Sequence, residues 1–156
     1  MNNLPVLPFV FLALLLLPVR VAPRRLRWLA FGLWALGGAL LTWRGVGRLA
    51  AAQSTVSPAV LIAVSIGALL IGFLKGRFVL SRTSARNLAR LAAAPGPLRP
   101  IEVYPARSWA LITLFMLLGL SLSWLHAPLL VRGGMSLAVG VALLGSSLDY
   151  LRGFPR

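Results

Sequence analysis

The sequence predicts an all-α fold, a polytopic transmembrane helical bundle in which four core spans form two hairpins and one N-terminal hydrophobic helix makes five spans. Composition is the first reason: 59% of the 156 residues are hydrophobic and the mean hydropathy is +0.89, whereas soluble domains contain about 45–50% apolar residues. The second reason is the spacing of the apolar runs, each close to the roughly 20 residues that a membrane span needs. Residues 1–156 are therefore expected to form a single integral membrane domain.

The first apolar run, Leu4–Val19, is followed rather than preceded by its basic residues, which begin at Arg20. A cleavable signal peptide has the opposite order, so we expect an uncleaved anchor with its N-terminus outside. The run would rise only about 24 Å along a helix, short of a ~30 Å hydrocarbon core. Whether residues 4–22 span the membrane or lie in the interface is left open.

The next run, Trp28–Trp43, has a tryptophan at each end, as is typical of segments that end at the headgroup level. A loop, Arg44–Ser57, is expected to follow it, with a short surface helix at Leu49–Ala52. Pro58–Leu74 is the next span, and Ser57 is its expected N-cap because a serine hydroxyl can accept a hydrogen bond from a free N–H of the first turn.

The second hairpin is expected from Trp109–Leu125 and Met135–Leu151, joined by a turn at His126–Gly134. In this layout thirteen of the sixteen basic residues lie on one side, and Arg44, Arg48 and Arg132 lie on the other. Cytoplasmic loops carry an excess of Lys and Arg, so the C-terminus is predicted to be cytoplasmic. Because arginine outnumbers lysine fifteen to one, we expect a GC-rich bacterial genome and hence the bacterial cytoplasmic (inner) membrane.

Residues 75–108 are predicted to form a cytoplasmic basic amphipathic helix, about Val79–Ala93, followed by a proline-rich loop. Basic side chains share one stripe of this helix, and Ala85, Leu88, Leu91 and Ala92 lie opposite. Clusters of 4–8 juxtamembrane Lys and Arg residues are typical of binding to acidic lipids. The expected lipid- or anion-binding residues are Lys75, Arg77, Arg82, Arg86 and Arg90. The alternative is that these charges only fix topology; nucleic acid is not an expected partner.

Small residues in the spans predict close helix packing, because in lipid helices associate where their backbones can approach. The expected packing residues are Gly67, Gly72, Gly76, Ser136, Gly140 and Gly145. We expect contacts within the bundle, with a homo-oligomer or a larger membrane complex as the alternative use of these residues.

The residues that usually carry catalysis are scarce: the chain has no cysteine, one histidine and two acidic residues. No four-ligand metal site, catalytic group or cofactor is therefore expected. Glu102 is expected to be neutralised by Arg99 or Arg107, Asp149 to pair with Arg152, and His126 to be an interfacial residue. The predicted spans hold no ionisable residue at mid-depth, which disfavours a transporter.

These observations favour a structural or accessory membrane protein, not an enzyme, whose basic helix binds anionic phospholipids or an acidic membrane partner. The alternative is a small oligomeric transporter or channel for a neutral or anionic solute, and a third hypothesis is a membrane enzyme that acts on lipid phosphates. The solute path of the alternative would follow Gly67, Gly72, Gly140 and Gly145, with Ser65, Thr113, Ser121, Ser123 and Ser136 as hydrogen-bonding groups.

Overall fold

The computed structural model describes residues 20–106, 109, 113, 117, 121 and 127–151, and this part of the chain is helical without a β-strand. Three helical segments are long and apolar enough to cross a membrane: Pro23–Ser54, Pro58–Ala92 and Leu129–Leu151. They indicate a membrane protein. The predicted run Leu4–Val19, most of Trp109–Leu125, His126 and the tail Arg152–Arg156 lie outside the described residues.

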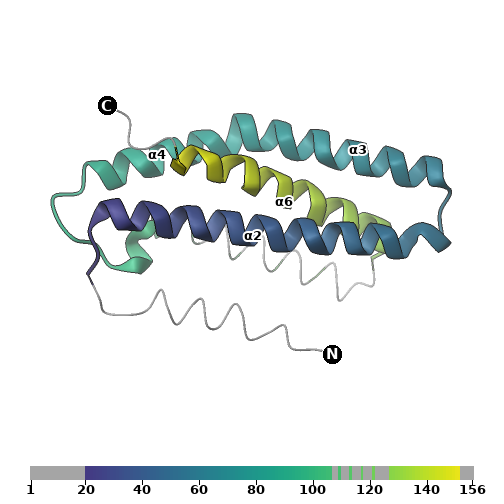
Figure 1. Cartoon of the computed structure of the whole chain (residues 1–156), viewed down its shortest axis with the longest axis horizontal. Coiled ribbons are helices and arrows are strands. Elements are labelled where there is room, and N and C mark those ends of the chain that lie inside the picture. Colours follow the sequence, from purple (N-terminus) through teal and green to yellow (C-terminus); the bar gives the residue numbers. More distant parts are fainter. Residues whose placement is uncertain are drawn as a thin grey trace.

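Three long helices pack side by side, with α2 antiparallel to α3 and α6 (Figure 1). Their bounds are Pro23–Ala51 for α2, Pro58–Lys75 for α3 and Leu129–Leu151 for α6. Shorter elements complete the described chain: the 3₁₀ turns η1 (Ala52–Ser54) and η3 (Pro100–Val103), the π turn η2 (Gly76–Leu80) and the helix α4 (Ser81–Ala92).

The start of α3 agrees with the prediction. Pro58 occupies the first helical position, and the Ser57 hydroxyl accepts a hydrogen bond from the Val60 N–H at 3.5 Å. Proline suits this position because its missing N–H would have no partner in the helix, and the serine satisfies one of the free donors.

The predicted end of α2 is wrong. The helix does not end at Trp43 but continues to Ala51, and η1 occupies part of the predicted loop Arg44–Ser57. The start of α6 is also earlier than predicted, at Leu129 rather than Met135. Arginine is a good helix former, so a charge that ends an apolar run does not end the helix.

Glycines hold α2 and α6 together. A Cβ at Gly45 would lie 2.6 Å from the backbone nitrogen of Leu137, and one at Gly133 would lie 2.9 Å from Cγ of Leu49. Gly140 similarly faces the backbone of α2 at Gly38 and Thr42. Backbones this close leave no room for a Cβ at the glycine, so each contact needs a glycine on at least one of the two helices.

A π turn joins α3 to α4 without a break. The carbonyl oxygen of Gly76 accepts the backbone N–H of Ser81 and also the hydroxyls of Ser81 at 3.0 Å and Ser146 at 3.2 Å. The buried residues of α3 (Ala68, Gly72) and of α4 (Ser84, Leu88, Leu91) would point about 150° apart on an unbroken α-helix. The wider π turn advances fewer degrees per residue and so reduces this difference, and both helices contact α6.

The main hydrophobic core lies at the end of the bundle where α4 and η3 fold back onto α2 and α6. Its buried residues are Leu26, Ala30, Leu88, Leu91, Val103, Tyr104 and Tyr150. A two-way backbone pair, Val21 N to Leu98 O at 2.8 Å and Leu98 N to Val21 O at 3.0 Å, ties the loop after α4 to the start of α2. The end of the bundle is therefore a folded unit rather than a free helix and loop.

Candidate anion-binding surface

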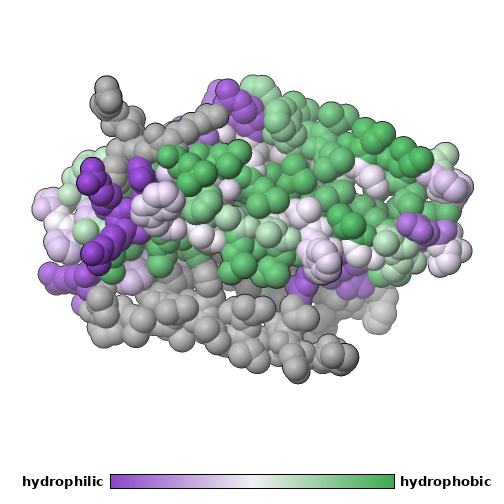
Figure 2. Space-filling model, viewed as in Figure 1, coloured by the Kyte–Doolittle hydropathy of each residue, from purple (hydrophilic) through white to green (hydrophobic). Residues whose placement is uncertain are grey.

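Basic residues from three segments gather around this folded end, which we call the basic end. Hydrophilic residues collect there, while hydrophobic surface covers much of α2 and α3 (Figure 2). The basic residues come from the start of α2, from α4 and from the following loop: Arg20, Arg24, Arg25, Arg27, Arg82, Arg86, Arg90 and Arg99. The predicted residues on α4 are therefore part of a larger positive surface.

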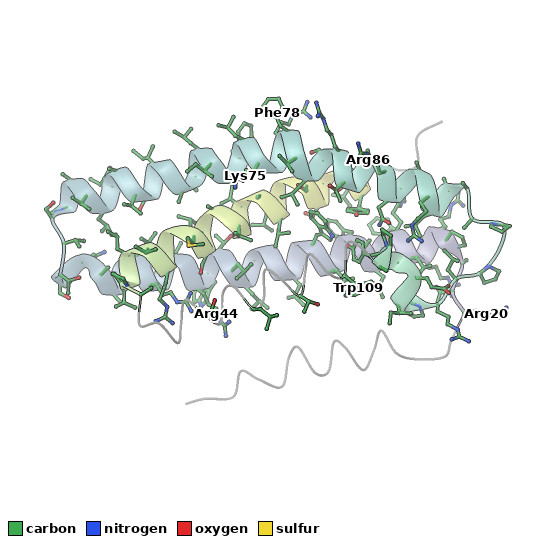
Figure 3. All side chains as sticks on the ribbon, turned by 180° about the vertical axis from the view of Figure 1, so that it is seen from behind. Arg20, Arg44, Lys75, Phe78, Arg86 and Trp109 are labelled. Atoms are coloured by element: carbon green, nitrogen blue, oxygen red, sulfur yellow. The ribbon has the colours of Figure 1, made fainter. Side chains whose placement is uncertain are left out.

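Two of the predicted residues, Arg82 and Arg86, are exposed on α4, and Arg86 is labelled in Figure 3. The buried face of the same helix consists of Ser84, Asn87, Leu88 and Leu91. Ala85 and Ala92, predicted for the apolar face, are exposed instead. The apolar face of α4 thus packs against the rest of the protein. It is not available to lie in a lipid interface.

Arg90 differs from its two neighbours on the predicted stripe. Its Nη2 donates to the carbonyl oxygen of Val103 at 2.8 Å, to that of Glu102, and to Oδ1 of Asn87 at 3.3 Å. These bonds hold the loop against α4. Arg90 therefore adds positive charge to the surface, but its guanidinium group is engaged in hydrogen bonds that stabilise the fold.

Lys75 and Arg77 lie away from the α4 arginines. Both are exposed, and Figure 3 shows Lys75 near the middle of the bundle's length, with Arg86 closer to the end that carries Arg20. Gly76, between them, packs against Ala142 of α6, nine residues before the end of that helix at Leu151. This distance is about 14 Å along the axis, so Lys75 and Arg77 lie farther from the basic end than Arg82 and Arg86 do.

Among the described residues, the carboxylate of Glu102 bonds to a backbone N–H rather than to an arginine side chain. Its Oε2 accepts a hydrogen bond from the N–H of Arg99 at 2.8 Å. The carboxylate therefore caps the short η3 turn, and the predicted alternative partner, Arg107, lies outside the described residues. Asp149 is partly buried near the end of α6, and its predicted partner Arg152 is also outside them.

Aromatic residues pack beneath the basic end, and the sequence did not predict that they meet. The ring of Tyr104 lies 5.6 Å from that of Trp109 and 6.5 Å from that of Trp34, and Trp34 lies 6.0 Å from Tyr150. The Tyr150 hydroxyl accepts a hydrogen bond from the amide of Asn87 at 3.4 Å. No local pattern marks these residues, because they come together from segments far apart in sequence.

Burial raises the pKa of Tyr104 well above its ordinary value of 10.0. Its hydroxyl donates to the carbonyl of Ala30 at 3.4 Å, and the neutral form fits this site. A group whose folded pKa is raised contributes stability below its unfolded pKa and loses it as the pH rises toward the folded value. We therefore expect thermal stability to fall above about pH 10, and the Tyr104→Phe variant to lose less over the same range. Melting curves in detergent between pH 8 and 11.5 measure both; equal alkaline losses in the two proteins would refute the assignment.

The predicted packing residues divide into two groups. Gly72 and Gly76 face Ala138 and Ala142 of α6, and Gly140 faces α2. Ser136 accepts a hydrogen bond from Arg48. Gly67 and Gly145, in contrast, have no atom within 4 Å of a Cβ built on them among the residues that the structure describes.

No known protein family, curated protein or solved structure matches this chain.

Proposed function

We propose that this protein is a multi-pass helical protein of the bacterial cytoplasmic membrane, with four or five spans and the basic end on the cytoplasmic side. Its role is structural or accessory rather than enzymatic: the basic end binds anionic phospholipid headgroups and so places the bundle, alone or with a membrane partner. With five spans the N-terminus is outside, and the C-terminus is cytoplasmic in either case.

The exposed pair Arg82 and Arg86 on a fully packed helix is the observation that carries this proposal. Leu88 and Leu91, 4% and 0% exposed, anchor α4 in the core, so the positions of the two arginines are set before any ligand arrives. Because folding has already fixed this part of the backbone, binding a ligand does not carry the entropic cost of ordering it. Each juxtamembrane arginine near an anionic leaflet contributes about 1 kcal/mol.

The length of the continuous helix supports the same placement. Pro58–Ala92 contains 35 residues, which rise about 52 Å, some 20 Å more than a ~30 Å hydrocarbon core requires. If its apolar part, Pro58–Leu74, lies in the hydrocarbon, α4 emerges on the basic side and continues past the headgroups. The arginines on its first turns are then level with lipid phosphates.

The double variant Arg82→Gln/Arg86→Gln tests the proposal. We expect it to lose about thirtyfold in preference for phosphatidylglycerol over phosphatidylcholine, since two contacts of about 1 kcal/mol each are removed. The measurement is the fraction of motionally restricted spin-labelled lipid around the full-length protein in reconstituted bilayers. The preference of the unmodified protein should also weaken as salt is raised.

The matched control is Arg82→Lys/Arg86→Lys, which keeps both charges and should keep most of the preference. A glutamine variant that retains the full, salt-insensitive preference would exclude the basic end as the lipid-binding surface.

A transporter or channel for an anionic solute is a second candidate function, and one observation favours it. Arg44, Arg48 and Arg132 lie inside helices. The sequence had predicted loops at these positions, and hence spans without an ionisable residue. Arginines inside membrane spans usually mark ligand or ion pathways. Of the hydrogen-bonding groups predicted for such a path, Ser136 contacts Arg48, while the Ser65 hydroxyl donates within its own helix to Leu61 O at 2.8 Å.

A further inference from the structure

A second group of positive side chains lies on α2 and α6, toward the opposite end of the bundle from α4. Arg44 and Arg48 are one helical turn apart on α2, and Arg132 and Ser136 are one turn apart on α6. We call these four residues the arginine cluster. Figure 3 shows Arg44 well separated along the bundle from Arg20 and Arg86.

The glycine contacts between α2 and α6 bring the cluster together. Gly45 lies against Leu137 and Gly133 lies against Leu49, so the two backbones approach closely beside the arginines. Nη1 of Arg48 crosses this interface and donates to Oγ of Ser136 at 2.8 Å. Arg44 and Arg132 both lie near enough to Arg48 for their charges to repel it.

The cluster lies within the apolar length of the bundle rather than beyond it. A Cβ at Gly134 would lie 3.0 Å from the side chain of Val64, and Leu49 and Leu137 form one core cluster with Ala68. Val64 is six residues into α3, about 9 Å from its start. If α3 spans the hydrocarbon, the cluster lies about two helical turns inside it, where charge is costly and is usually retained for function.

No acidic side chain of the chain is placed to offset these charges. The sequence has two acidic residues, Glu102 and Asp149. Asp149 lies thirteen residues beyond Ser136 on α6, about 20 Å along the axis. Glu102 lies in η3, next to the start of α2 rather than its end. A negative group that approaches from outside the chain would relieve the repulsion among the arginines.

We propose that Arg44, Arg48 and Arg132, with Ser136 holding Arg48 in place, form a binding site for a phosphate-type oxyanion at the α2–α6 interface. Guanidinium groups match phosphate oxygens with paired N–H donors. Arg44 is exposed, and Leu40 and Trp43 beside it on α2 are 38% and 80% exposed. The same surface therefore offers positive charge next to apolar area, which fits the phosphate and acyl chain of a lipid. A soluble phosphate would use the arginines alone.

The test uses the full-length protein in mild detergent, in the Arg82→Gln/Arg86→Gln background, so that the basic end contributes less. Native mass spectrometry follows added phosphatidylglycerol, with phosphatidylcholine as the zwitterionic control. Thermal stabilisation by inorganic phosphate forms the second arm. We expect Arg44→Gln/Arg48→Gln to weaken binding at least tenfold in one arm. The charge-retaining control Arg44→Lys/Arg48→Lys should keep most of the binding.

The two arms separate the sources of the anion. Loss of phosphatidylglycerol binding assigns the site to a lipid, and loss of phosphate stabilisation assigns it to a soluble anion. No binding in either arm, or equal losses in the cluster and control variants, would overturn the proposal. If the Arg48→Gln variant fails to fold, Arg44→Gln at the exposed arginine and Ser136→Ala, which removes the group that holds Arg48, are tested instead. The same losses of binding in the two arms are then expected. Because the background lacks Arg82 and Arg86, failure of the proposed function does not affect this result.

Discussion

Replacing Gly140 by leucine is expected to separate α2 from α6 and to destabilise the protein by roughly 1–3 kcal/mol or more. A Cβ at this position would lie 2.9 Å from the carbonyl oxygen of Gly38 and 2.5 Å from the backbone nitrogen of Thr42. Both neighbours are backbone atoms, which cannot move aside like the end of a flexible side chain. The whole helix would have to shift, and the α2–α6 contact would be lost along its length. Thermal or SDS-induced unfolding of the full-length protein in detergent measures the effect.

Gly145→Leu is the matched control on the same helix. Gly145 is exposed and has no described atom within 4 Å of a built Cβ. Both substitutions gain the same helix propensity, about 1 kcal/mol, so the difference between them isolates packing. Similar stability of the two variants would show that the α2–α6 interface is not held by close backbone approach.

Leu91→Ala is expected to have the largest effect at the basic end. Leu91 is 0% exposed and belongs to the core formed with Leu26, Val103 and Tyr150. Truncating a buried leucine to alanine usually costs about 2–5 kcal/mol, because the cavity left behind is only partly filled. We expect amide hydrogen exchange in α4 and η3 to become much faster, while exchange in α3 changes little.

Leu151→Ala removes the same atoms from a side chain that is 44% exposed, and it should change exchange by only a small amount. If the Leu91 variant loosened α3 and α6 as much as α4, the basic end would not be a separable folded unit. The Leu91 variant also keeps every arginine, so weaker lipid preference in it would show that the arginines must be held in position.

The sequence was most informative where local chemistry decides the structure. Ser57 and Pro58 identify the start of α3, because capping depends on neighbouring residues alone. The helix around Arg82 and Arg86 was predicted to within about two residues from charge spacing and from the prolines that follow it. The membrane character followed from composition.

It was least informative where contacts between distant segments decide. The end of the apolar run at Trp43 predicts the end of a helix, but α2 continues to Ala51. Helix geometry depends on backbone hydrogen bonds and not on hydrophobicity. The consequence was that Arg48 was assigned to a loop and its contact with Ser136 was missed. The joining of Trp34, Tyr104 and Tyr150 could not be predicted either, because nothing in their spacing links them.

The π turn Gly76–Leu80 has a consequence for any shortened version of this chain. Removing a single amino acid there would let the backbone return to ordinary α-helical winding. Because four α-helical residues turn through about the same angle as five residues of a π turn, the residues beyond it would keep their direction. Leu88 and Leu91 would stay in the core, whereas the same deletion within α3 or α4 would rotate everything beyond it by about 100°. The π turn is thus the place where this helix can lose one residue without turning its positive charge away.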